Sequence, residues 1–267
     1  MKKVIFFFLV FSVHFLGAQV KLVTWNVENF GRSKSAATLL YMSQLLKEYD
    51  VVALQEVVAG PGGAQAVAKL VDALNRSGSK WDYTISNPTS GRPNQSERYA
   101  FLWKTAVVKK KGKAWLEQKY HVEMEREPYC CTFTHQGKPF TLVSFHAVTK
   151  RAQPEREIKY LKFFPGLYPS NRLIFLGDFN CPASHSVFSG LKKIGFTQVF
   201  THQKTSLKKA CVQGTCLASE FDNIWYSSAH VSVTQSQAIH FYTSFTTLKA
   251  ARRVSDHIPL TTTLYLR

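Results

Sequence analysis

The sequence has few acidic residues and lacks several features that would define other kinds of protein. Asp and Glu number 17 among 267 residues, against 34 Lys and Arg, so the formal net charge is +17. No Pro-, Gly- or Ser-rich linker, internal repeat or low-complexity tract divides the chain, which favours one domain over residues 19–267. No apolar run reaches the roughly 20 residues that a membrane span requires, so stable membrane insertion is not expected.

The N-terminal apolar run is short and has the layout of a secretory signal peptide. Two lysines precede an apolar stretch over residues 4–11, and a small Gly-Ala pair ends at Ala18. We therefore expect residues 1–18 to be a signal peptide that is cleaved near Ala18. The mature protein would be secreted to the extracellular space or the periplasm. The alternative is an uncleaved membrane anchor, which the shortness of the run disfavours.

Cysteine is scarce, and its spacing excludes the common zinc motifs. None of the five cysteines has the two-residue spacing of a zinc-binding pair, and in an exported protein a disulfide is the alternative. Cys211 and Cys216 flank a turn-like Val-Gln-Gly-Thr spacer, so a local disulfide between them is the first choice. A bridge from Cys181 to Cys216 remains open. The odd count leaves at least one cysteine unpaired or bridged to another molecule.

The excess of basic residues indicates a polyanionic partner. It is spread over several segments, namely Lys109–Lys111 with Lys113, Lys192–Lys193, Lys208–Lys209 and Arg252–Arg253. A positive field attracts the phosphate backbone of nucleic acid. The alternative is that these side chains serve solubility alone, as a single lysine cluster usually does.

Hydrophobic patterning predicts two cycles of strands and helices separated by hairpins. In the first half we expect strands near 20–27, 51–55 and 81–86 and helices near 36–48 and 64–76. Extended segments follow at 98–104, 129–135 and 139–147. The second cycle has helices over 154–164 and 186–194 and strands over 172–176, 221–226 and 258–265. Two such halves fit two packed sheets with helices on the outside.

Polar side chains are found where the apolar strands stop. Because the ends of buried strands can converge, these side chains are candidates for one site: Asn26, Glu56, Asp178, Asn180 and the pair Asp256-His257. Carboxylate and amide oxygens, without a cage of thiolates or imidazoles, select Mg²⁺, Mn²⁺ or Ca²⁺ over zinc. Glu56 is the strongest ligand candidate, because an unpaired carboxylate would be costly there. The alternative is a helix-capping or salt-bridged glutamate.

Two of the nine histidines occupy positions suited to proton transfer. His257 precedes a core strand, and His146 ends the apolar run 140–145. Histidine is the usual proton carrier near neutral pH. A lone histidine at a strand end is more often structural, but the acidic residues at the other strand ends favour a catalytic role here.

Eight short motifs occur in a fixed order between about Val20 and Leu266. They cover residues 24–27, 54–57, 96–99, 126–128, 144–146, 177–180, 221–224 and 255–259. Together they resemble the exonuclease-endonuclease-phosphatase superfamily, and most closely its secreted deoxyribonuclease I group. The resemblance implies an α/β (α+β) fold, a four-layer sandwich of two mostly antiparallel β-sheets flanked by helices. It also implies phosphodiester hydrolysis that depends on Mg²⁺, with Mn²⁺ as an alternative and Ca²⁺ often assisting.

The resemblance assigns catalytic roles to five residues. His257 would activate water or contact the scissile phosphate, with Asp222 orienting its ring, and Asp178 is the competing base. His146, with Glu97 as its carboxylate partner, would protonate the leaving oxygen or stabilise the developing charge. A carboxylate fixes the tautomer of its histidine and stabilises the imidazolium.

The resemblance also implies a metal side and a phosphate side. Glu56 would hold the metal with help from Asn26 and Asp256. The residues implied in phosphate or substrate binding are Asn180, Arg126, Arg98 and Tyr99. The basic residue that the deoxyribonuclease I group carries shortly after its metal-binding glutamate is missing from Val57–Pro61.

The leading hypothesis is therefore a secreted, monomeric, metal-dependent nuclease that cleaves DNA with low sequence specificity. One alternative is a phosphatase or a sphingomyelinase-type phosphodiesterase of the same superfamily, which would need a lipid-seeking loop. Another is a genotoxin-like nuclease subunit that acts with partner proteins.

Overall fold

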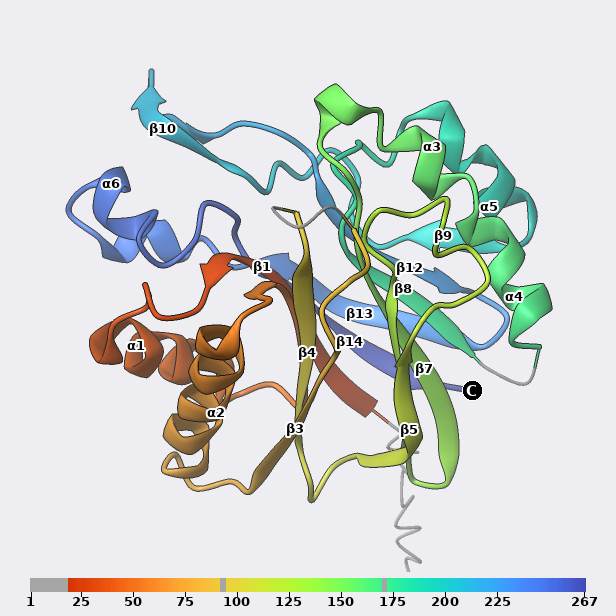
Figure 1. The fold of residues 1–267 in the computed structure, drawn as a ribbon, viewed down its shortest axis with the longest axis horizontal. Helices are drawn as coiled ribbons and strands as arrows, with labels where there is room; N and C mark the ends of the chain where they lie inside the picture. Colours follow the sequence, from red (N-terminus) through yellow and green to blue (C-terminus); the bar gives the residue numbers. More distant parts are fainter. Residues whose placement is uncertain (1–18, 92–94, 170–171) are drawn as a thin grey trace, which may run out of the picture.

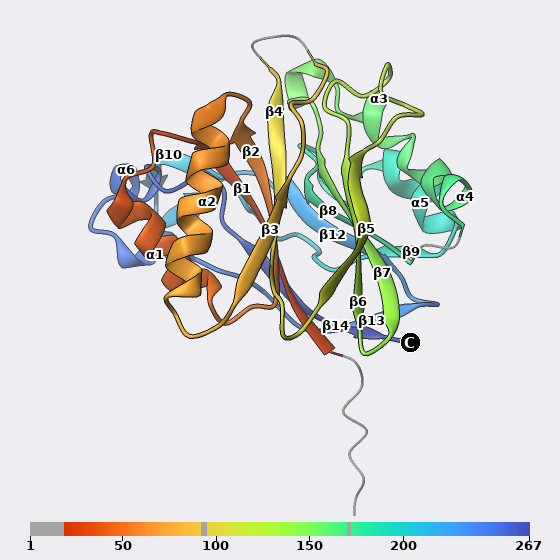
Figure 2. The ribbon, with the colours of Figure 1, turned by 60° about the horizontal axis from the view of Figure 1, so that its bottom comes forward.

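The computed structural model describes residues 19–91, 95–169 and 172–267. Two six-stranded sheets pack face to face, and helices cover the outer side of each, as Figure 1 and Figure 2 show. The four-layer sandwich predicted from the sequence is confirmed. The signal-peptide prediction concerns residues 1–18, which lie outside the described residues.

The first sheet contains the N-terminal strands. Its order is β13 (Val231–Ala238), β14 (Leu260–Leu266), β1 (Gln19–Phe30), β2 (Val51–Val58), β4 (Glu97–Lys104) and β3 (Trp81–Ile85). β1 and β2 are parallel, and the other pairs are antiparallel. The elements that cover its outer face are α1 (Ala36–Leu46), α2 (Pro61–Asn75), η4 (Phe241–Ser244) and α6 (Leu248–Ala251).

The second sheet repeats this plan. Its order is β5 (Lys109–Leu116), β6 (Tyr129–His135), β7 (Lys138–His146), β8 (Leu173–Asp178), β12 (Asp222–Ser227) and β9 (Phe196–Gln198). Only β7 and β8 are parallel within it. Its outer side carries short helical turns, namely η1 (Lys150–Ala152), α3 (Glu155–Ile158), η2 (Leu161–Phe163), α4 (Phe164–Leu167), η3 (Ser186–Phe188) and α5 (Ser189–Lys193).

A buried apolar layer joins the two sheets. Leu22 and Phe101 from the first sheet pack with Phe133, Leu142 and Ile224 from the second, and each of these side chains is fully buried. Burying one such side chain stabilises the fold by roughly 1.5–3 kcal/mol. This layer therefore fixes the position of one sheet relative to the other.

The register of the strands brings the predicted site residues to one edge of the sandwich. His146, at the end of β7, is paired with Asp178 at the end of β8, and Asp178 is paired with Asp222 at the start of β12. Gly177 allows this close pairing, because its φ is +132° and a side chain there would meet the Phe145 carbonyl oxygen at 2.1 Å. In the first sheet, Val58 is paired with Glu97.

The predicted helix over 154–164 is wrong, since short turns replace it. The chain forms α3, then the separate turn η2, and then α4, which begins at Phe164 and has Pro165 in its first turn. Strands β5 and β13 are absent from the sequence prediction. Both are edge strands with mostly polar, exposed side chains, so they lack the apolar alternation that marks an interior strand.

A small hairpin of β10 (Leu207–Val212) and β11 (Thr215–Leu217) stands apart from both sheets. Cys211 and Cys216 form a disulfide across it, which confirms the first choice made from the sequence. The alternative bridge from Cys181 is wrong, because Cys181 is free and buried. Within the described part of the chain, no helix is long and apolar enough to cross a membrane.

Candidate active site

The first carboxylate–histidine pair links the two sheets. His146 ends β7, and Glu97 begins β4 of the other sheet. The Nδ1 atom of His146 lies 2.9 Å from both carboxylate oxygens of Glu97. Burial and the nearby Arg126 lower the pKa of His146, but Glu97 and Asp178 outweigh them and raise the pKa above its usual value. The pair thus stabilises a protonated His146.

The second pair is formed by His257 and Asp222. His257 Nδ1 lies 2.6 Å from Asp222 Oδ2. Burial alone would lower the pKa of His257, but the charges of Asp222 and Asp178 and the hydrogen bond that His257 donates to Asp222 raise this pKa well above its usual value. His257 is anchored through its backbone, because its N–H donates to Ser255 Oγ at 3.0 Å and its carbonyl accepts from Trp25 Nε1 at 2.8 Å.

Asp178 lies between the two histidines. Its Oδ2 atom is 3.5 Å from His146 Nε2 and 3.8 Å from His257 Nε2. Both histidines thus turn Nδ1 towards their own carboxylate partner and Nε2 towards Asp178. Asp178 is 1% exposed, and its Oδ1 accepts from the Asn180 backbone N–H at 2.8 Å. The arrangement places two proton carriers and one carboxylate around a single point.

Asn26 and Glu56 add an oxygen-rich group beside Asp178. Asn26 Nδ2 donates to Glu56 Oε1 and to Asp178 Oδ2, both at 3.0 Å. Asn26 Oδ1 is buried and has no hydrogen-bond partner among the described residues, although an unsatisfied buried acceptor is costly. Two carboxylates and a free amide oxygen are the donors that Mg²⁺ prefers, so the residues present fit a hard divalent cation.

The backbone is strained where two of these side chains leave their strands. Glu56 and Asn180 have φ angles of +59° and +48°, a left-handed conformation that non-glycine residues rarely adopt. At Glu56 the strand register shifts between Leu54 and Val57, which marks a bulge. Such strain persists where the surrounding structure fixes it, and it is concentrated at functional sites.

The Arg126 guanidinium is held by contacts with its neighbours in the site. Its Nε donates to the His146 carbonyl at 3.0 Å, and its Nη2 donates to the Ala147 carbonyl. Its Nη1 lies 3.7 Å from Glu97 Oε2. Arg126 also lines a cavity of about 530 Å³ together with Glu56 and Glu97, so this cavity opens beside the first carboxylate–histidine pair.

Three predicted residues are not brought into this group. Tyr99 is fully buried between the sheets, and its hydroxyl accepts from the His146 N–H at 3.2 Å; its predicted contact with phosphate is wrong for this structure. Arg98 donates to the carbonyls of Ala59 and Ser86, both at 2.8 Å. The Asp256 carboxylate lies beside Arg252, with Nη2 and Oδ2 separated by 3.4 Å.

Sequence reasoning missed the residues that position the site. Glu157 is fully buried and accepts from the N–H groups of Glu125 and Val148, each at 2.9 Å. Thr205 Oγ1 accepts from the Asp222 N–H at 3.0 Å. Neither residue lies in a recognised motif. The only sequence signal for Glu157 is an acidic residue inside an otherwise amphipathic segment.

A second group of possible ligands lies outside this site. Glu155, Cys181 and His185 have ligand atoms within 4.8 Å of one another. However, His185 Nδ1 accepts from the Val187 N–H at 3.2 Å, so the ring proton of a neutral His185 is on Nε2, 3.6 Å from Glu155. A protonated Nε2 does not bind metal, and this N–H faces the partly exposed Glu155 carboxylate instead.

Comparison with known proteins agrees with this geometry. The chain belongs to the Endonuclease/Exonuclease/phosphatase family, whose model matches residues 23–257. It is 27% identical to Deoxyribonuclease-1 of Bos taurus over 266 residues, which cover 93% of each chain. It is also 26% identical to Deoxyribonuclease of Thioalkalivibrio sp., covering 91% of this chain and 70% of that protein.

Solved structures share the fold at lower identity. The catalytic domain of human Nocturnin aligns with a TM-score of 0.65 and 17% identity, covering 94% of this chain and 96% of that chain. D. rerio TDP2 complexed with a single strand DNA product aligns with a TM-score of 0.65 and 18% identity, covering 92% and 98%. These similarities concern the fold alone.

Proposed function

We propose that this protein is a secreted, divalent-metal-dependent endonuclease that hydrolyses phosphodiester bonds of DNA with low sequence specificity. The observation that carries the proposal is the meeting of two carboxylate–histidine pairs at Asp178 Oδ2, beside the oxygen-rich pair Asn26 and Glu56. The net charge of +17 supports a polyanionic substrate. The similarity to deoxyribonucleases over most of the chain supports DNA in particular.

In the proposed reaction, Asp178 accepts the proton of the attacking water. The oxygen of that water forms a bond to phosphorus, and the bond from phosphorus to the leaving oxygen breaks. We assign the base to Asp178 because His257, bonded to Asp222 and 3.8 Å from Asp178, is placed to hold a phosphate oxygen as a cation. The proposal thereby chooses between the two bases that the sequence left open.

His146 completes the proposed reaction by donating its Nε2 proton to the leaving oxygen. Glu97 stabilises the protonated ring before this transfer. Asn26 and Glu56 would hold Mg²⁺ or Mn²⁺, which neutralises phosphate charge when bound. Asn180, whose side-chain amide donates to the Ala147 carbonyl at 3.0 Å, keeps the Asp178 turn against the His146 loop.

Plasmid digestion tests the proposal. Wild-type protein should cleave plasmid DNA with Mg²⁺ or Mn²⁺ and not with EDTA. The variants His146→Ala and His257→Ala should each lower kcat by about 10²- to 10⁴-fold. His230→Ala is the matched control, because His230 is exposed and lies in the turn after β12, at the end of that strand opposite to Asp222. Absence of cleavage with every divalent ion, or full activity of both site variants, would refute the proposal.

A further inference from the structure

The disulfide hairpin is rooted directly on the second carboxylate–histidine pair. Leu207 N–H donates to the Asp256 carbonyl at 2.6 Å, and Ile258 N–H donates to the Thr205 carbonyl at 2.8 Å. These two bonds flank His257. On the other side, Thr205 Oγ1 accepts from the N–H of Asp222, the partner of His257. The base of the hairpin is therefore fixed relative to the reacting groups.

The hairpin is anchored at its base and exposed at its tip. Leu207 and Leu217 are buried in the outer core of the first sheet, whereas every residue from 209 to 215 is exposed. An isolated two-stranded hairpin is only marginally stable in water. The disulfide between Cys211 and Cys216 constrains the exposed end of the hairpin, which has no buried side chains to hold it.

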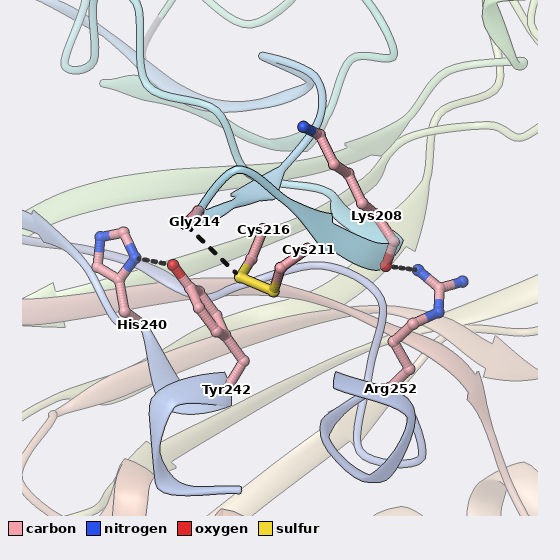
Figure 3. Close-up of a disulfide and its surroundings, with 7 residues drawn as sticks. All are labelled: Lys208, Cys211, Gly214, Cys216, His240, Tyr242 and Arg252. Carbon is pink, nitrogen blue, oxygen red and sulfur yellow. Dashed lines mark hydrogen bonds between the residues drawn. A yellow bond between two sulfur atoms is a disulfide. The ribbon is translucent and has the colours of Figure 1, made fainter. Parts of the chain in front are cut away.

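The surface of this hairpin is basic and has no acidic residue. Residues 203–219 contain Lys204, Lys208 and Lys209 and neither Asp nor Glu. Arg252 of the adjacent α6 segment donates to the carbonyls of Leu207 and Lys208, at 2.6 and 3.4 Å. Figure 3 shows Arg252 on one side of the strand while the Lys208 ammonium points away from it.

The basic cluster Lys109–Lys111 lies far from the hairpin and provides a comparison. Lys109 is paired with Thr134, and Thr134 is paired with Pro139 at the start of β7. His146 ends the same strand, so the Lys109–Lys111 cluster lies at the opposite end of the second sheet. It forms part of an edge strand, where lysines also prevent pairing with other chains.

We propose that the hairpin, residues 207–217, is an accessory grip for the DNA backbone beyond the scissile phosphate. This inference rests on the proposed nuclease function. Lys208 and Lys209 directly follow the anchored Leu207, so they would contact backbone phosphates that flank the one held at His257. A substrate without flanking nucleotides does not contact them.

The test separates binding from catalysis. Binding of a fluorescent duplex is measured by anisotropy in EDTA for Lys208→Glu/Lys209→Glu and for the control Lys109→Glu/Lys111→Glu, which changes the net charge equally. The hairpin variant should bind duplex at least about tenfold more weakly than the control variant. Its log–log salt dependence should also be shallower by about 1–2. If both variants weakened duplex binding equally, or if neither weakened it, the proposed role of the hairpin would be refuted.

Cleavage assays complete the test. For the hairpin variant, the rate on long duplex should fall about tenfold relative to the rate on bis(p-nitrophenyl) phosphate, which is too small to reach the hairpin. Cys211→Ser/Cys216→Ser should reproduce part of this selective loss. An equal loss on both substrates would place these lysines in the catalytic step and overturn the inference. Cleavage of the small diester but of no DNA by the wild type would instead refute the proposed substrate.

Discussion

Asn26 is the residue on which the site depends most, because its one amide group bonds carboxylates from both sheets. Its free Oδ1 and the half-exposed Glu56 carboxylate are the proposed metal donors. Only Glu56 contributes a negative charge from this pair, so the affinity for a divalent cation depends on that charge.

The variant Glu56→Gln tests this dependence. It should raise the Mg²⁺ or Mn²⁺ concentration needed for half-maximal activity by about 10- to 100-fold. Calorimetric titration should show the same weakening in the absence of substrate. Glu48→Gln, at an exposed position outside the strands, is the control. An unchanged metal titration would remove Glu56 from the metal site.

At the scale of elements, the short helix α3 holds two loops of the candidate site in place. Its residue Glu157 binds the N–H of Glu125, next to Arg126, and the N–H of Val148, two residues after His146. Burial raises the pKa of this carboxyl, while the two backbone bonds oppose the shift.

The variant Glu157→Gln replaces one acceptor oxygen by an amide donor. One backbone N–H then loses its partner, which should lower the free energy of unfolding by about 1–3 kcal/mol. We expect kcat to fall more than KM changes, because the loops carrying Arg126 and His146 lose their common anchor. Urea unfolding and steady-state kinetics measure both effects, with Glu155→Gln on the same helix as the control. A stability and kcat equal to those of the control would contradict this role.

Most interior strands and the edge strand β3 could be predicted from the sequence, whereas the polar edge strands β5 and β13 and the short turns could not. Residues 129–135 are rich in Tyr, Phe, Cys and Thr, which favour strands, and the structure reproduces these bounds. The lysine-rich β5 has no apolar signal, because its partner β6 supplies the context that makes it a strand. The pairing of His146 with Glu97 required a family resemblance, since 49 residues separate them in sequence.

At the scale of the whole molecule, buried thiols and a buried phenol should make the folded state less stable at alkaline pH. Burial raises the pKa of Cys131 to about 12 and that of Tyr129 to about 12, and it raises the pKa of Cys130 well above its usual value. The folded protein therefore keeps these groups protonated at pH values where the unfolded chain loses the protons. The contribution of these groups to the free energy of unfolding is complete below pH 9 and is lost as the pH rises towards 12.

Urea unfolding between pH 8 and 11 tests this expectation. Above pH 9, the free energy of unfolding should fall by about 1.4 kcal/mol per pH unit for each thiol that only the unfolded chain ionises. In Cys131→Ala, the free energy of unfolding should fall less steeply with pH, because one fewer thiol ionises in the unfolded chain. A free energy of unfolding that stays constant over this range would contradict the assignment.

The distribution of charge is also a property of the whole molecule, and the sequence did not predict it. The basic clusters were expected to attract a phosphate backbone, and the structure places Lys109–Lys111 and Lys208–Lys209 in different parts of the fold. Sequence neighbours reveal local charge, whereas only the strand register reveals which clusters share an edge with His257.

The division of the site between two sheets has a mechanical consequence. Glu56 and Asn26 move with the first sheet, while Asp178 and His146 move with the second. The spacing between the proposed metal donors and the two proposed proton-transfer residues is therefore set by the thickness of the apolar layer that contains Leu22 and Phe133. A change of side-chain volume inside this layer would therefore alter the geometry of the site without replacing any of the site's own residues.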